Sequence, residues 1–186
     1  MSTQNGALSP RKLTTPRDAM VGITLRPATL SDIEMIFDWR NDPFIVARST
    51  SQKTVNWHEH VAWFESTLQN DSRLMFILQL DGKPIGQARF ARIENNACVI
   101  SIYLLKDYTG KGYGVEGIRR SCYAVLHRWS VLEIIACVRL DNEAAKSAFL
   151  KASFVETQRQ GLCPVAHFAL SLDRERSTTS TEEAQP

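Results

Sequence analysis

The sequence contains no hydrophobic run near the roughly 18 residues that a membrane-spanning helix requires. Its N-terminus also lacks the apolar segment of a secretory signal. Charge of either sign is not in excess, since 22 basic and 20 acidic residues give a formal net charge of +2. This balance does not favour a nucleic acid or a membrane surface as partner. We therefore expect a cytoplasmic protein that binds neither.

Cysteine is also scarce, and its four residues form neither a CxxC pair nor a Cys/His spacing suited to zinc. Three of them lie in strongly apolar runs, which predicts buried and reduced thiols, as in a reducing cytosol. We expect no metal site. The cysteines are Cys98, Cys122, Cys137 and Cys163.

The 186 residues suit one domain, and the hydrophobic share of 44% suffices for one core. Residues 1–20 are rich in Ser, Thr and Pro, and residues 174–186 contain no large apolar side chain. Neither end offers enough apolar surface to offset the entropy of ordering. We predict a single domain over 21–173 between two disordered tails.

Hydrophobic periodicity predicts a mixed α/β sheet sandwiched by helices, in the order β-α-α-β-β-β-α-β-α-β-β. The expected strands are 21–26, 73–80, 84–92, 97–105, 131–139, 153–159 and 163–172, and the expected helices are 32–40, 57–69, 113–129 and 144–151. Asp81-Gly82 is typical of a hairpin turn. Ser31 and Glu34 have the spacing of a capping box, Leu30 is placed to pack on Met35, and 44–55 resembles a loop.

A glycine-rich turn at 110–114 (GKGYG) lies between an apolar strand and the start of a helix. Such a turn exposes backbone N–H groups at the positive end of the helix dipole, where a pyrophosphate can approach. A plain tight turn is the alternative. The Walker pattern is absent, and the GYGVEG string at 112–117 stands after several strands, where a dinucleotide fingerprint is not expected.

Residues 109–114 (TGKGYG) resemble the (Q/R)-x-x-G-x-(G/A) signature of the GNAT acetyltransferases, with Thr109 at the first position. Residues 142–154 (NEAAKSAFLKASF) are similar to the family's N-x-x-A segment, which continues to Y-x-K-x-G-F. The resemblance covers about 23–172. It implies a mostly antiparallel central sheet that splays between strands 97–105 and 131–139, with acetyl-CoA in the wedge.

The resemblance also implies a reaction in which an acceptor amine attacks the thioester directly. The residues expected at acetyl-CoA are Ile102, Tyr103, Leu104, Lys111, Gly112, Tyr113, Gly114 and Asn142. The family's usual acidic groups are missing, because Phe149 stands in place of a Tyr and Val99 in place of a Glu. Tyr103, Tyr113 and Ser147 are alternative proton donors. Ser153 replaces a Gly after the last helix, at a left-handed position that costs about 1 kcal/mol.

Four segments resemble the subgroup that acetylates amino groups of nucleotide-linked deoxy sugars in pathways such as that of pseudaminic acid. They are WRN at 39–41, HVAWF at 60–64, PIGQARF at 84–90 and ISI at 100–102. The expected acceptor contacts are Arg40, Asn41, His60, Trp63, Gln87 and Arg89, with His60 also a candidate base. An ion pair for Arg40 and a structural or core role for His60 and Trp63 are the alternatives.

Two other functions remain open from the sequence. The acceptor could be a protein N-terminus, as for ribosomal-protein acetyltransferases, or another small amine. The missing Tyr and Glu also suit a non-catalytic module that only binds acetyl-CoA. The protein is expected to be a monomer or a homodimer.

Overall fold

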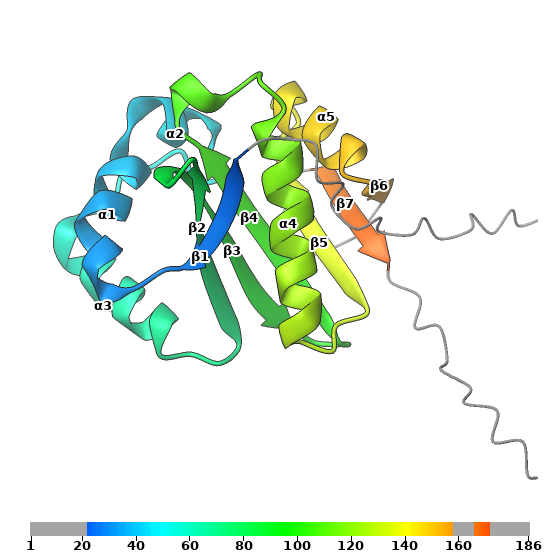
Figure 1. The fold of residues 1–186 in the computed structure, drawn as a ribbon, viewed down its shortest axis with the longest axis horizontal. Helices are drawn as coiled ribbons and strands as arrows, with labels where there is room; N and C mark the ends of the chain where they lie inside the picture. Colours follow the sequence, from blue (N-terminus) through cyan, green and yellow to red (C-terminus); the bar gives the residue numbers. More distant parts are fainter. Residues whose placement is uncertain (1–21, 158–165, 172–186) are drawn as a thin grey trace, which may run out of the picture.

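The structure is a computed structural model, and it describes residues 22–157 and 166–171. These residues form a seven-stranded sheet in the order β1-β2-β3-β4-β5-β7-β6 (Figure 1). Each neighbouring pair is antiparallel except β4 and β5, which are parallel. The strands are β1 (Ile23–Pro27), β2 (Arg73–Leu80), β3 (Lys83–Ile93), β4 (Ala97–Leu104), β5 (Glu133–Val138), β6 (Val155–Thr157) and β7 (Ala166–Ser171). The predicted fold class is confirmed.

Helices cover both faces of this sheet. They are α1 (Ile33–Asn41), α2 (Pro43–Arg48), α3 (Trp57–Leu68), α4 (Tyr113–Arg128) and α5 (Glu143–Lys151), with 3-10 turns η1 (Leu30–Asp32) and η2 (Lys106–Tyr108). The short α2 lies where a loop was expected. The Asp42 side chain accepts a hydrogen bond from the Phe44 amide at 2.7 Å, and Pro43 occupies the first turn. Both features favour a helix start.

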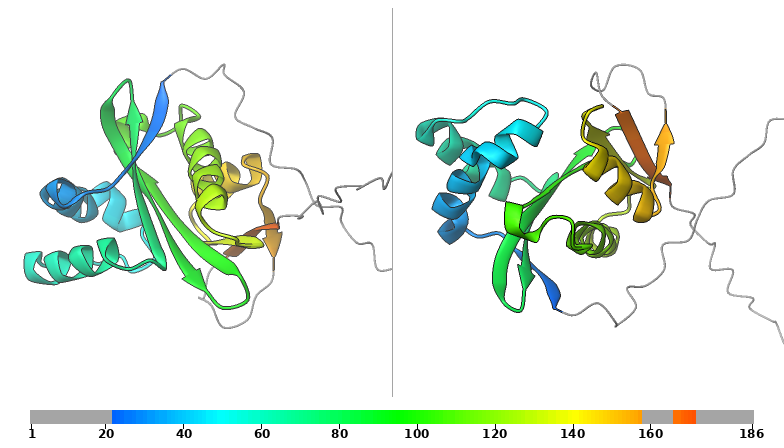
Figure 2. Two further views of the ribbon diagram at one scale, coloured as in Figure 1. Left: turned by 60° about the horizontal axis from the view of Figure 1, so that its bottom comes forward. Right: turned by 90° about the horizontal axis from the view of Figure 1, so that it is seen from above.

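Two clusters of apolar side chains divide the helices between the faces. The larger cluster joins β-strand residues such as Phe90 and Ile134 to Ile118 of α4 and Phe149 of α5. The smaller one joins Ile36 of α1 and Phe64 of α3 to Met75 and Ile77 of β2, on the opposite face. Figure 2 shows α1 and α3 on one side of the sheet and α4 and α5 on the other. The cluster under α1 and α3 defines what we call the α1/α3 face.

The hairpin between β2 and β3 fixes which side chains reach the α1/α3 face. Asp81 and Gly82 have φ of 49° and 78°, as a primed hairpin turn requires, so the predicted turn is confirmed. The register shifts between Leu78 and Gln79, where Ile85 of β3 is the extra residue of a bulge. Beyond the bulge, Met75 lies opposite Arg89.

The start of the helical region is capped differently from the prediction. The Thr29 amide donates to the Asp32 carboxylate at 2.8 Å, and Arg26 of β1 binds the same carboxylate at 2.6 and 2.8 Å. Arg26 thereby holds the pKa of Asp32 below its usual range. The predicted Ser31–Glu34 box is therefore wrong. Leu30 is 60% exposed, so it does not form the expected apolar staple.

Several smaller expectations can also be compared with the structure. Asn142 caps α5 by accepting from the Ala145 amide at 3.1 Å. Ser153 has φ of 75°, which confirms the left-handed position. Cys98 and Cys122 are buried thiols, whereas Cys137 is half-buried. Cys163 and the two predicted tails lie outside the described residues. Among the helices of the described part, none is long and apolar enough to cross a membrane.

Candidate active site

The parallel strands β4 and β5 separate halfway along their length. They pair only from Ala97 to Ile100 of β4, opposite Glu133 to Ala136 of β5. Beyond this point β4 continues to Leu104 against β3, and β5 continues to Val138 against β7. The predicted splay is therefore present. We call the space between the diverging ends the β4–β5 opening.

Only some backbone groups of β4 face the β4–β5 opening. The Leu105 amide donates to the Ile85 carbonyl of β3 at 2.9 Å. Because the N–H and C=O groups of successive strand residues point to opposite edges, the Tyr103 backbone also points to β3. The backbone groups of Ile102 and Leu104 point to the opening. Of the three β4 residues expected at acetyl-CoA, Ile102 and Leu104 therefore direct backbone N–H and C=O groups toward the space where β5 has diverged.

The glycine-rich turn lies at the start of α4 and presents unused donors. Gly110 and Gly112 have φ of 73° and 83°, and Gly112 is the N-cap of α4. Among the described residues, nothing accepts a hydrogen bond from the amides of Lys111 to Gly114. The first turn of α4 packs close to β4, since a Cβ on Gly114 would lie 3.8 Å from Leu104 Cδ1. Free amides at a helix N-terminus suit a pyrophosphate.

The α1/α3 face carries a second polar cluster, which we call the arginine cluster: Arg40, Trp63, Gln87, Arg89 and Tyr103. Gln87 and Tyr103 are directly opposite each other on β3 and β4, and Arg89 follows on the same face. The Arg40 guanidinium lies over the Trp63 ring, 4.5 Å from the ring centroid. The Arg89 guanidinium lies 5.2 Å from the same ring. Trp63 is thus a shared cation–π surface for two arginines.

Among residues 22–157 and 166–171, no carboxylate compensates these two charges. The ion pairs of the described residues involve neither Arg40 nor Arg89. Burial lowers the pKa of both arginines, and Arg40 lowers that of Arg89 further. An uncompensated guanidinium pair in a partly buried position is costly, so it indicates a site for an anion.

Two further donors of the arginine cluster lack partners. The Tyr103 hydroxyl and the Gln87 amide nitrogen are both buried, with no hydrogen-bond partner among the described residues. Burial also raises the pKa of Tyr103, so its hydroxyl keeps its proton at neutral pH. Buried polar groups are normally bonded in a resting protein. These donors therefore suit a ligand rich in oxygen acceptors.

The structure gives two predicted acceptor residues other partners. His60 is 1% exposed, and its Nε2 lies 2.9 Å from the Ile33 carbonyl oxygen. Asn41 forms two hydrogen bonds to the backbone of Val55, at 2.9 and 3.0 Å. His60 thus lies in the core, and Asn41 holds the loop before α3. The structural alternative for His60 fits the geometry.

Two residues that the sequence reasoning did not assign also contribute. The Trp39 ring meets the Tyr103 ring edge to face, with centroids 6.3 Å apart. Arg73 of β2 adds a third positive charge, which lowers the pKa of Arg89. Arg73 and Met75 are two residues apart on one strand, so strand alternation alone places Arg73 on the α1/α3 face.

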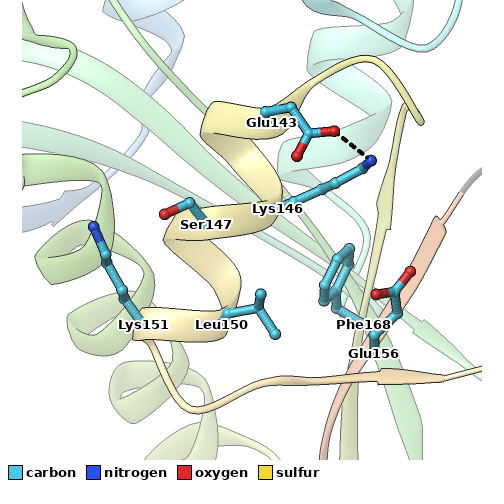
Figure 3. A pocket seen from close by; sticks show the side chains of 7 residues that line it. All are labelled: Glu143, Lys146, Ser147, Leu150, Lys151, Glu156 and Phe168. Atoms are coloured by element: carbon cyan, nitrogen blue, oxygen red, sulfur yellow. Dashed lines mark hydrogen bonds and ion pairs between the residues drawn. The ribbon is translucent and has the colours of Figure 1, made fainter.

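Phe149 and Val99 occupy the positions where the family's usual Tyr and Glu are missing. Phe149 is buried, with its ring 5.0 Å from Phe154 and 6.2 Å from Phe168 between centroids. Val99 is half-buried in β4. Ser147 is exposed and lines an open pocket formed by α5, β6 and β7 (Figure 3). This pocket is lined by Glu143, Lys146, Ser147, Leu150, Lys151, Glu156 and Phe168.

Comparisons with known proteins agree with this architecture. The acetyltransferase PseH of Campylobacter jejuni is 30% identical over 81 residues, which are 44% of this chain and 51% of that relative. The match thus spans about half of that relative's length. The structure of AAC(6')-Ib with ribostamycin and coenzyme A has a TM-score of 0.73 at 22% identity, covering 84% of this chain and 99% of that one.

A spermidine N-acetyltransferase from Vibrio cholerae, solved with CoA and spermine, has a TM-score of 0.71 at 16% identity and covers 81% of this chain and 95% of that one. Residues 23–155 match the acetyltransferase (GNAT) domain family. That range includes β4, the glycine-rich turn, α4 and α5. The chain is therefore a member of the GNAT acetyltransferase family.

Proposed function

We propose that this protein transfers the acetyl group of acetyl-CoA to a primary amine on a nucleotide-linked amino-deoxy sugar. The observation that carries the proposal is the arginine cluster. Within the described residues, it combines two guanidinium groups without a carboxylate and two buried donors without partners. A sugar nucleotide supplies a diphosphate for the arginines and hydroxyl or carbonyl oxygens for the other donors.

The similarity to the acetyltransferase PseH supports acetyl transfer, over a match that covers about half of that relative. The electrostatics of the α1/α3 face support an anionic acceptor. A polycationic acceptor would meet Arg40, Arg73 and Arg89 without compensating carboxylates, and like charges at close range repel. An anionic acceptor would relieve that repulsion.

The donor fits the other side of the sheet. The amides of Lys111 to Gly114 would hold its pyrophosphate, and the edges of Ile102 and Leu104 would bind its pantetheine arm. The bound donor supplies the thioester. A backbone N–H at the β4–β5 opening is placed to stabilise charge on the thioester oxygen as the amine attacks. Holding two reactants on either side of one strand supplies much of the remaining rate enhancement.

The burial of His60 disfavours it as the base for proton transfer in this site. Tyr103 keeps its proton, because burial raises its pKa, so it can donate a hydrogen bond to the acceptor but cannot take the ammonium proton. Phe149 has no proton to give to the thiolate. Coenzyme A thiolate is a fair leaving group, and acid–base assistance contributes only about 10²- to 10⁴-fold in rate. Water at the opening can carry the proton.

The proposal is tested with acetyl-CoA and a panel of UDP- and dTDP-linked 4-amino-deoxy sugars, peptides and polyamines. CoA release gives the rate, and mass spectrometry identifies the product. We expect acetylation of a nucleotide sugar, with UDP competing against the sugar nucleotide and not against acetyl-CoA. Transfer only to peptides or polyamines would reject the acceptor class. Binding of acetyl-CoA without any transfer would favour the non-catalytic alternative.

A further inference from the structure

His60 occupies the junction between α1, α3 and the arginine cluster. Its Nε2 lies 2.9 Å from the carbonyl oxygen of Ile33, the first residue of α1. Its ring centroid lies 5.3 Å from that of Phe37 on α1. On its own helix, the ring centroid of Trp63 is 5.6 Å away. The His60 side chain therefore connects α1 and α3 and packs against the Trp63 ring, which both arginines contact.

The bond to Ile33 also defines the state of the imidazole. A carbonyl oxygen only accepts, so Nε2 must carry the proton. Nδ1 is buried and has no partner among the described residues. Burial lowers the pKa of His60, and the charge of Arg40 lowers it further. A proton on Nδ1 would add a positive charge beside an arginine cluster that already lacks carboxylates.

We propose that His60 is a positioning residue, which sets the affinity for the acceptor by holding Trp63, and through Trp63 the two arginines, in place. This inference rests on the proposed function only in assigning the α1/α3 face to the acceptor. Arg40 lies two helical turns after Ile33, so α1 also connects the anchored carbonyl to that guanidinium. The hydrogen bond to Ile33 thus positions the helix that carries Arg40, and the ring contact positions Trp63.

Three variants separate the two contacts. His60→Ala removes both, His60→Gln retains a donor for the Ile33 carbonyl, and His60→Phe retains the ring. His58 is the matched control, because it is two residues away on α3 and exposed. All are assayed with the amine that the wild type acetylates fastest, so an error in the proposed acceptor class leaves the test valid.

We expect His60→Ala to raise the acceptor KM about tenfold, the range in which a lost cation–π surface acts. His60→Gln and His60→Phe should fall between it and the wild type. The acetyl-CoA KM, kcat and the pH profile of kcat should stay within about twofold, and His58→Ala should change nothing. A merely structural role would instead raise both KM values together and so overturn the proposal.

Three other results would also overturn it. A loss of about 100-fold or more in kcat for His60→Gln, with loss of a pH limb, would make His60 a general base. An unchanged acceptor KM in His60→Ala would show that Trp63 needs no support. Independently of any acceptor, ¹⁵N NMR should find the neutral Nε2–H form at pH 7, and a cationic or Nδ1–H ring would refute the geometry.

Discussion

Arg89 should make the free protein less stable than it would be with an unbranched apolar side chain such as that of methionine. Its charge has no carboxylate partner in the described part of the chain, and both burial and Arg40 lower its pKa. Replacing buried ionic groups by apolar side chains of similar volume is often neutral or stabilises by about 1–4 kcal/mol. Arg89 is only half-buried, and its substitution also removes the contact with Trp63, so the lower end of this stability range applies. We expect Arg89→Met to gain about 1 kcal/mol, or roughly 2–4 °C in Tm.

Urea unfolding of the two proteins measures this difference, with Arg92→Met as the control. Arg92 lies on the same strand but is exposed and covers the Trp129 ring at 4.6 Å, so its removal should cost roughly 0.5 kcal/mol or less. If Arg40 and Arg89 repel, the double variant Arg40→Met/Arg89→Met should gain less than the sum of the single variants.

Ligand should reverse the order of stability. With coenzyme A at saturation to occupy the glycine-rich turn, pyrophosphate at 100 times its Kd should stabilise the wild type by about 2.7 kcal/mol. Arg89→Met should respond far less. If Arg89→Met were destabilised by about 1 kcal/mol or more without ligand, the guanidinium would have a structural role, and an anion site would not explain its position.

Four further outcomes are expected. Gly112→Ala and Gly82→Ala impose similar backbone strain, because the two glycines have φ of 83° and 78°. Each substitution should lower the free energy of unfolding by roughly 1 kcal/mol. Calorimetry should find weaker acetyl-CoA binding only for Gly112→Ala. Ser153→Gly should stabilise by about 1 kcal/mol in denaturant, because φ of 75° strains a serine. Phe149→Tyr should lower stability by roughly 1–3 kcal/mol without raising kcat, since its ring is enclosed by other rings. Burial lowers the pKa of His60 in the folded protein, so below pH about 6.5 the unfolded chain binds a proton at His60 that the folded chain does not. Acidification from pH 8 to 5 should therefore reduce the unfolding free energy of the wild type more than that of His60→Gln.

Periodicity predicted the long elements well because their apolar residues repeat over several turns or pleats. It missed α2, whose six residues are too few to show a period, although Asp42 and Pro43 carry a helix-start signal. The cap before α1 was misassigned because Thr29–Asp32 and Ser31–Glu34 both fit the same spacing. The ion pair from β1 to Asp32 decides between them, and no local pattern contains that contact.

Some features of the candidate site could likewise be predicted from the sequence, and others could not. The glycine-rich turn was predictable, since its chemistry lies in consecutive residues. The pairing of Gln87 with Tyr103 depends on the β3–β4 register, and the bulge at Ile85 shifts the β2–β3 register by one residue. His60 and Trp63 were correctly placed on one helix face. Only the packing of α1 over that face shows that His60 is enclosed while Trp63 meets the arginines.

The divergence of β4 and β5 also divides the sheet mechanically. Four residue pairs form the only strand seam between the half-sheet β1–β4 and the half-sheet β5–β7–β6 in the described residues. Past Ile100, the two halves are joined across the gap by helices rather than by a hydrogen-bond ladder. A ligand lying in the gap and contacting both strands would strengthen the connection between the two half-sheets. Occupancy of the donor site would therefore govern whether the halves unfold as one unit or part along this seam.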